Sequence, residues 1–186
     1  MKSGLIKIVL IIGLMLGLGL FVAYGTTRAV IIYCGMYFLV AVNEILRVFL
    51  RQNKRKKMFA EAQAKSKELG KPLMVIGDPY NGDGSKIHGV SYGCGDVCVD
   101  LTGCPNCPNG IETKLPAGLE KIKDDSHVVF LSCVLEYVDD YKKTIEEIKR
   151  VGGNNVFAVT LSPYQLTSYL YQGAKNVFYK NPFTLE

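Results

Sequence analysis

The sequence predicts an α/β protein in which a small parallel sheet follows a membrane-spanning helical hairpin. Two apolar runs lie near the N-terminus, and a basic cluster follows them over residues 51–57. From residue 72 onward, short apolar runs alternate with turn signals and amphipathic stretches, a pattern typical of strands alternating with helices. The expected units are a membrane anchor over 1–57, a helical linker over 58–71 and an α/β domain over 72–186.

The first apolar run, Ile8–Thr27, contains no charged side chain and is long enough to cross a bilayer, which takes roughly 20 residues. The second run, Ala29–Leu50, carries Glu44 and Arg47 near its end. As spans of about 5–27 and 29–50, the two runs form a hairpin with both ends in the cytoplasm. Two alternatives stay open: the second run lies in the membrane interface, or the first is a cleaved signal peptide.

Charge divides the chain into a basic and an acidic part. Residues 1–57 hold nine Lys/Arg and one Glu, whereas residues 58–186 hold thirteen Lys/Arg and sixteen Asp/Glu. Basic residues beside a span mark the cytoplasmic side and attract anionic headgroups. We therefore expect a membrane protein with its C-terminal domain on the cytoplasmic face. The expected partners are the lipid bilayer and a membrane-associated protein assembly. Nucleic-acid binding is not expected, because the folded domain is acidic.

The elements of the soluble part follow from periodicity and punctuation. Met58–Leu69 is rich in helix formers and is followed by Gly70 and Pro72, which predicts a helix ending there. A second helix starts at Tyr141, with Asp139 or Asp140 as its N-cap and Gly152-Gly153 at its end. Ser162-Pro163 predicts a third helix over 164–171. Strands are expected at Pro72–Ile76, Asp96–Leu101, His127–Ser132 and Asn155–Leu161, with a fifth at Asn176–Tyr179.

Ligands of parallel α/β sheets bind at the carboxyl ends of the strands, around the first strand–helix turn. Here the first expected strand is followed by Gly77-Asp78-Pro79-Tyr80-Asn81-Gly82-Asp83-Gly84. Asp100 ends the next expected strand, where an acidic residue binds ribose hydroxyls in dinucleotide-binding sheets. Read from the residues alone, the segment fits a plain tight turn and a nucleotide loop equally well.

The segment Asp124–Val151, DDSHVVFLSCVLEYVDDYKKTIEEIKRV, resembles class I S-adenosylmethionine-dependent methyltransferases of the type-11 branch. Its VLEYVDD stretch, Val134–Asp140, is similar to the turn after the fourth strand in that family. Over residues 72–161 the resemblance implies a small Rossmann-like sheet with S-adenosylmethionine as cofactor. It implies Gly77, Asp78, Asp100, Ser132 and Cys133 as the cofactor-binding residues.

The chain also departs from this family. The family's first loop is an acidic residue followed by G-x-G-x-G, whereas Pro79 and Tyr80 stand there in this chain. Proline removes a backbone donor from a loop that would bind the cofactor through its amides. No general base is identified, so an active methyltransferase and a non-catalytic domain of the same fold both fit.

Two classes of function follow from these observations. The first is a membrane-anchored, methyltransferase-type domain that transfers a methyl group from S-adenosylmethionine to a substrate near the membrane. The alternative is a non-catalytic structural protein, for example one that links the shell of a large virus particle to its inner membrane.

Four cysteines, Cys94, Cys98, Cys104 and Cys107, occur within fourteen residues as C-x₃-C-x₅-C-x₂-C. Zinc sites use four such soft ligands in a tetrahedral array. Reduced thiols with a structural or redox role are a second interpretation. Disulfides are a third, although they are rare in cytosolic domains. The spacing leaves all three open.

Overall fold

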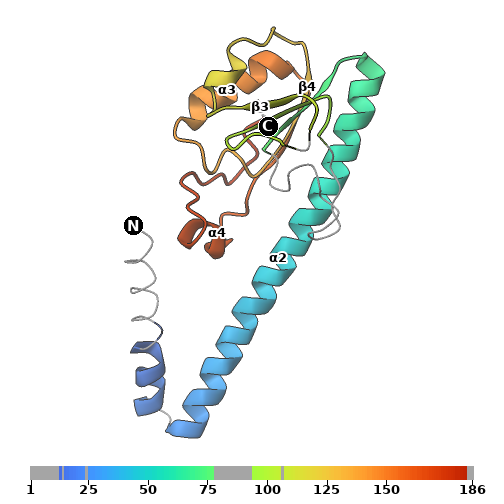
Figure 1. The fold of residues 1–186 in the computed structure, drawn as a ribbon. Coiled ribbons are helices and arrows are strands. Elements are labelled where there is room, and N and C mark those ends of the chain that lie inside the picture. Colours follow the sequence, from blue (N-terminus) through green and yellow to red (C-terminus); the bar gives the residue numbers. More distant parts are fainter. Residues whose placement is uncertain (1–12, 14, 24, 78–93, 106, 184–186) are drawn as a thin grey trace.

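The computed structural model describes residues 13, 15–23, 25–77, 94–105 and 107–183. These residues form a five-stranded, all-parallel sheet of order β3-β2-β1-β4-β5. The strands are β1 (Leu73–Ile76), β2 (Val97–Asp100), β3 (Gly110–Glu112), β4 (Val128–Ser132) and β5 (Val156–Val159). The helices are α2 (Thr26–Leu69), η1 (Ala117–Leu119), α3 (Tyr141–Gly152) and α4 (Leu166–Leu170). The protein is therefore Rossmann-like in its general arrangement (Figure 1).

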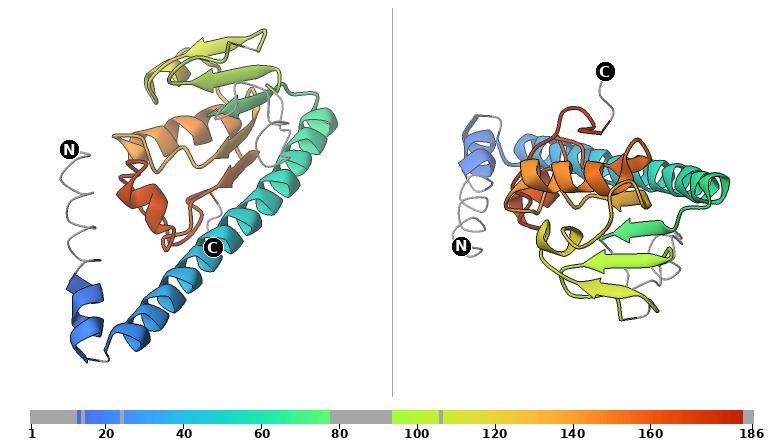
Figure 2. Two further views of the ribbon diagram at one scale, coloured as in Figure 1. Left: turned by 60° about the horizontal axis from the view of Figure 1, so that its bottom comes forward. Right: turned by 90° about the horizontal axis from the view of Figure 1, so that it is seen from above.

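The chain builds the sheet outward from β1 in two directions. It adds β2 and β3 on one side, which the second view of Figure 2 shows side by side with β1. It then crosses to the other side of β1 and adds β4 and β5. This is the order 3-2-1-4-5 of doubly wound sheets, and it places the topological switch point between β1 and β4.

Both faces of the central strands are buried, as a parallel sheet with a helical layer on each side requires. All four residues of β1 and all five of β4 are buried. Alternate residues of β1 belong to two separate hydrophobic cores, with Met74 and Ile76 in one and Leu73 and Val75 in the other. Figure 1 shows α3 and α2 on opposite sides of the strands.

Helix α3 covers the first face through Ile148 and Val151, both fully buried. Its N-cap is Asp140, whose side chain accepts a hydrogen bond of 3.0 Å from the Lys143 amide, as the sequence predicts. The helix ends at Gly152, also as predicted. The rest of this core comes from Met74, Ile76, Val99, Leu119, Val129, Leu131, Leu135 and Ala158.

Helix α2 covers the second face with its C-terminal part. Phe59 and Ala62 are buried there, and the Phe59 ring meets the Phe130 ring edge-on with centroids 5.2 Å apart. The helix expected over 58–69 is confirmed and ends at Leu69, where Gly70 adopts the left-handed conformation. It is the last part of α2, however, and it packs on the sheet instead of forming a separate linker. Tertiary packing of an apolar stripe decides its position.

The N-terminal half of α2 is apolar and exposed, and it includes exposed Val30, Phe38 and Leu50. Of the described helices, α2 is the one that is long and apolar enough to cross a membrane, as an anchor or a signal segment. Residues 15–23 are helical as well, and the chain turns at Gly25 before α2 begins. These nine residues extend about 14 Å, about half of a hydrocarbon core. The span expected over about 5–27 therefore stays a prediction.

Three elements differ from the sequence-based expectation. The sequence does not predict strand β3, because an alternation over three residues is too short to distinguish from a loop. Residues 176–179 form no strand, although one was expected there. Instead, the Asn176 side-chain amide donates hydrogen bonds of 2.8 Å to the carbonyls of Leu135 and Val138. Helix α4 covers only five residues of the expected 164–171.

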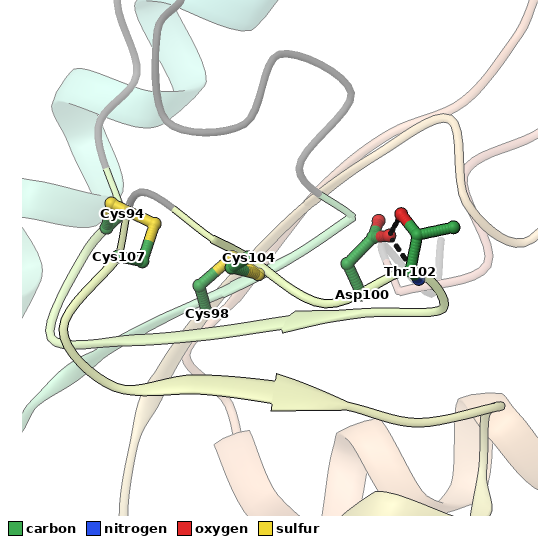
Figure 3. The surroundings of a disulfide bond; sticks show 6 residues. All are labelled: Cys94, Cys98, Asp100, Thr102, Cys104 and Cys107. Atoms are coloured by element: carbon green, nitrogen blue, oxygen red, sulfur yellow. Dashed lines mark hydrogen bonds between the residues drawn. A yellow bond between two sulfur atoms is a disulfide. The ribbon is translucent and has the colours of Figure 1, made fainter.

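Two disulfides link the connection between β2 and β3 to β2 and to the residues just before β2 (Figure 3). They join Cys94 to Cys107 and Cys98 to Cys104. Parallel strands are usually joined by a helix, whereas the described residues between β2 and β3 form none. The covalent links therefore hold the sheet edge where a covering helix is usual.

Replacement of Phe59 by alanine should lower the free energy of unfolding by about 3 kcal/mol, because it leaves a cavity between α2 and β4. Urea denaturation of the full chain in detergent would measure this. Lys56→Ala, on an exposed position of the same helix, is the matched control and should change little. Equal stability of both variants would contradict the packing described here.

The denatured chain should show two free thiols without reductant, Cys34 and Cys133, and six after reduction. Reduction should also lower the free energy of unfolding, by about 3 kcal/mol for the Cys94–Cys107 loop. Cys34→Ser should keep the same response to reductant, since Cys34 is unpaired. Six reactive thiols before reduction would disprove the pairing.

Candidate functional site

A cavity of about 520 Å³ lies at the carboxyl ends of the strands. Every strand contributes to its wall at or just after its last residue. The contributing residues are Gly77, Asp100, Thr113, Ser132, Cys133 and Leu161. Cavities of this size hold small molecules in other proteins, and the carboxyl edge beside the switch point is where doubly wound sheets bind ligands. This cavity is the candidate functional site.

The cavity edge of the sheet faces the apolar half of α2. Strand β1 begins just after α2 ends, and the chain reverses direction between them. Along β4, Phe130 meets Phe59 of α2, whereas Ser132, two residues closer to the cavity, meets Arg55. Moving toward the carboxyl ends of the strands therefore means moving back along α2 toward its N-terminal half, as Figure 1 shows.

Gly77 forms the β1 side of the cavity. Its amide donates a 2.7 Å hydrogen bond to the Val99 carbonyl, and its φ is +78°. A Cβ atom at this position would lie 2.3 Å from Val134 Cγ2. Glycine is therefore required here both by the backbone conformation and by the close approach of the β4 turn. Asp78, predicted to bind the cofactor beside Gly77, lies outside the described residues.

Asp100 ends β2 and lines the cavity. Its Oδ1 accepts hydrogen bonds from the Thr102 amide, at 2.9 Å, and the Thr102 hydroxyl, at 2.8 Å (Figure 3). Its backbone carbonyl accepts a bond from the Thr113 amide of the adjoining strand connection. The carboxylate is thus held in place by its own turn, at the position predicted for an acid that binds ribose.

Ser132 and Cys133 form the β4 side of the cavity. Cys133 has a φ of +57°, which is uncommon for a residue with a side chain, and its amide donates to the Val159 carbonyl at 2.7 Å. The Ser132 hydroxyl accepts a 2.5 Å hydrogen bond from Nε of buried Arg55. Burial raises the pKa of the Cys133 thiol, and nearby Arg55 partly opposes this. The thiol is therefore protonated at neutral pH.

The VLEYVDD turn forms one side of the cavity and uses its acids structurally. Fully buried Glu136 accepts a 2.5 Å hydrogen bond from the Leu161 amide, and burial raises the pKa of its carboxyl group. Hydrogen bonds from Lys114 and Lys175 lower the pKa of Asp139 to about 2. Asp140 caps α3. The residues that carry the family resemblance thus shape the turn beside the cavity.

Two arginines of α2 line the cavity, although no motif in the sequence marks them as site residues. Their position after the apolar run predicts that Arg51 and Arg55 belong to the basic flank of a membrane anchor. Instead, Arg55 is buried against Ser132, and Arg51 Nη1 donates a 2.9 Å hydrogen bond to Gln165 Oε1. One signal was available: Arg51 and Arg55 are spaced with Phe59 and Ala62 along one helical stripe, which packs on the domain.

The predicted metal ligands Cys94, Cys98, Cys104 and Cys107 come together, but not as thiols. The sulfur atoms of Cys98, Cys104 and Cys107 lie within 4.8 Å of one another, a grouping compact enough to hold a metal ion. In this structure all four cysteines are in disulfides. Zinc binds the thiolate form of cysteine, so the paired state does not offer the four predicted ligands.

The structure thus brings four of the five predicted cofactor-binding residues, Gly77, Asp100, Ser132 and Cys133, to one cavity. What the cavity binds is not indicated by any relative. Comparison with known protein families, with curated proteins and with solved structures gives no match to this chain.

Proposed function

We propose that the protein is a membrane-anchored domain that binds S-adenosylmethionine in the cavity at the carboxyl edge of its sheet. The supporting observation is the position of the cavity, at the switch point and beside Gly77, Asp100, Ser132 and Cys133. An acid at the end of β2 provides acceptors for the two hydroxyls of a ribose. Apolar side chains of Val99, Leu101 and Val134 line the same cavity and suit the faces of an adenine ring.

Methyl transfer is the reaction that the family resemblance implies for such a site. It depends on holding donor and acceptor in line, and a preformed cavity lined by residues at the ends of all five described strands supports such positioning. No step in this proposal requires a thiolate at Cys133, whose pKa burial raises.

We propose that α2 anchors the domain on the cytoplasmic face of the membrane, with the preceding apolar run as a second span. The basic residues that follow the apolar half support this side. Exposed Lys54, Lys56 and Lys57 carry that charge outside the cavity wall. The two disulfides argue for an oxidising compartment instead. If the cysteines are reduced in the cell, their cluster becomes a zinc-site candidate.

A structural role is the second candidate function, and strand β3 supports it. Among the described strands, β3 is at the sheet edge next to β2 only, and two of its three residues are exposed. An exposed edge strand offers backbone groups that pair with another chain. A protein that joins a membrane to a surrounding shell would use such an edge.

Calorimetric titration of the full chain in detergent should show binding of S-adenosylmethionine with a micromolar dissociation constant. Asp100→Ala should weaken it at least tenfold, because a charge-assisted hydrogen bond to ribose is lost. Glu146→Ala removes an exposed acid on α3 and should bind like the unchanged protein. Absence of binding, in a protein whose melting curve shows that it is folded, would leave the structural role as the better proposal.

An epitope at the C-terminus should resist protease in intact cells and be digested after the membrane is permeabilised. The positive flank of α2 is the physical reason for this side. A known outward-facing protein digested in the same cells is the control. Digestion before permeabilisation would place the domain outside, in agreement with the disulfides.

A further inference from the structure

We propose that the cavity also binds a phosphate group, held against Arg51 and Arg55 of α2. The phosphate is part of the substrate, and this substrate is the molecule that accepts the methyl group. The acceptor role rests on the proposed function, whereas phosphate binding itself does not. A membrane lipid headgroup and a soluble phosphate ester offer the same chemistry, and the experiment below separates them.

The arginines present donors to the cavity from one side of α2. They are four residues apart, so their side chains lie on the same face of the helix. Arg55 is 5% exposed, and its Nε is held by Ser132 at the end of β4. Arginine binds phosphate through several donors in a planar fork, and Arg51 presents such a fork to the cavity one turn away from the Arg55 guanidinium.

Arg51 has hydrogen-bonding capacity that the protein leaves unused. Its Nη1 donates to the neutral Gln165 side chain, and its buried Nε has no partner. Within the described part of the chain, Arg51 forms no ion pair with a carboxylate. A buried donor without a partner is costly, and a ligand that accepts a hydrogen bond there removes the cost.

The other charged groups of the cavity leave this wall positive. Lys114 is paired with Asp139, at 2.7 Å, so these two charges offset each other. Asp100 is on the β2 side, within its own turn. Both arginines interact electrostatically with the carboxyl group of Glu136. This carboxyl group is fully buried and accepts a hydrogen bond from the Leu161 amide. Among the residues that the structure describes, an incoming anion therefore meets two guanidinium groups at this wall against one buried acid.

The position of the arginines relative to the apolar part of α2 points to a lipid as the source of the phosphate. Exposed apolar side chains on α2 continue to Phe49 and Leu50, and Arg51 is the next residue. Arg55 lies about 6 Å beyond Arg51 along the helix axis. The headgroup layer on each side of the hydrocarbon core is about 5 to 8 Å thick. With the apolar half of α2 in a bilayer, the cavity wall lies at headgroup depth.

Tyrosines near the same level fit this placement. Tyr164 and Tyr171 flank α4 and are exposed. Arg47 on α2 lies over the Tyr164 ring, with its Cζ 5.3 Å from the ring centroid, and bonds to Ser162 Oγ at 2.7 Å. Tyrosine is enriched at the interface between membrane and water. The segment after β5 is thus fixed to α2 about 6 Å from Arg51, toward the apolar half of the helix, where the hydrocarbon core meets the headgroups in this placement.

The test uses the full chain in two settings. In a phosphate-free maltoside detergent, glycerol 3-phosphate is titrated and binding is followed by calorimetry. In nanodiscs of phosphatidylcholine, the same titration is repeated with and without added phosphatidic acid. We expect binding in detergent and competition by phosphatidic acid in the nanodiscs. Binding of glycerol 3-phosphate in both settings with no effect of phosphatidic acid would keep the phosphate site and overturn the lipid as its source.

Arg51→Gln should weaken glycerol 3-phosphate binding at least tenfold, and Arg51→Lys should retain part of it. Lys54→Gln makes the same charge change on an exposed position of α2 outside the cavity and should have no effect. Melting curves identify any variant that fails to fold. Equal weakening by Lys54→Gln, or no phosphate binding in either setting, would overturn the inference.

Titration of S-adenosylmethionine on the same samples separates this inference from the proposed function. Cofactor binding without phosphate binding overturns the phosphate site alone. Phosphate binding without cofactor binding overturns the proposed function and its acceptor role, and leaves the phosphate site in place.

Discussion

The packing of α2 against the sheet is the contact on which the rest of the structure depends. One stripe of this helix carries Phe59 and Ala62 into the core and Arg55 and Arg51 into the cavity wall. The apolar pair supplies the burial that fixes the helix to β1, β4 and β5. Because the helix is thereby held in register, the Arg55 guanidinium is positioned at the end of β4, where Ser132 and Cys133 close the cavity.

The parts of the fold that burial dictates were predictable from the sequence. Strands β1, β4 and β5 are short apolar runs between turn signals, and each was expected within one or two residues of its observed bounds. Helix α3 combines an acidic N-cap, an apolar face and two terminal glycines, so its type and both its ends were also predictable. The Rossmann-like arrangement follows from these elements, because parallel strands with interleaved helices have few other solutions.

Other features depend on contacts between residues far apart in the chain, and local pattern does not contain them. Asn176 was placed in a strand, but its amide bonds to two carbonyls some 40 residues earlier. The pairing of the four cysteines was open because four cysteines allow three connectivities. Charge next to an apolar run is a strong local signal and predicts a membrane flank for the basic cluster. The tertiary structure places two arginines of that cluster in the cavity wall.

The continuity of α2 has a mechanical consequence. From residue 36 to its end the helix contains neither glycine nor proline, and among the described residues no break separates its apolar half from the half that packs on the sheet. A helix of this kind bends little, since sharp kinks need such residues or a bulge. If the apolar half of α2 spans a bilayer, no flexible linker allows the domain to rotate freely relative to that span. With α2 in a bilayer, as we propose, the helix would set the height and orientation of the domain above the lipid, and the cavity would stay at one depth of that membrane.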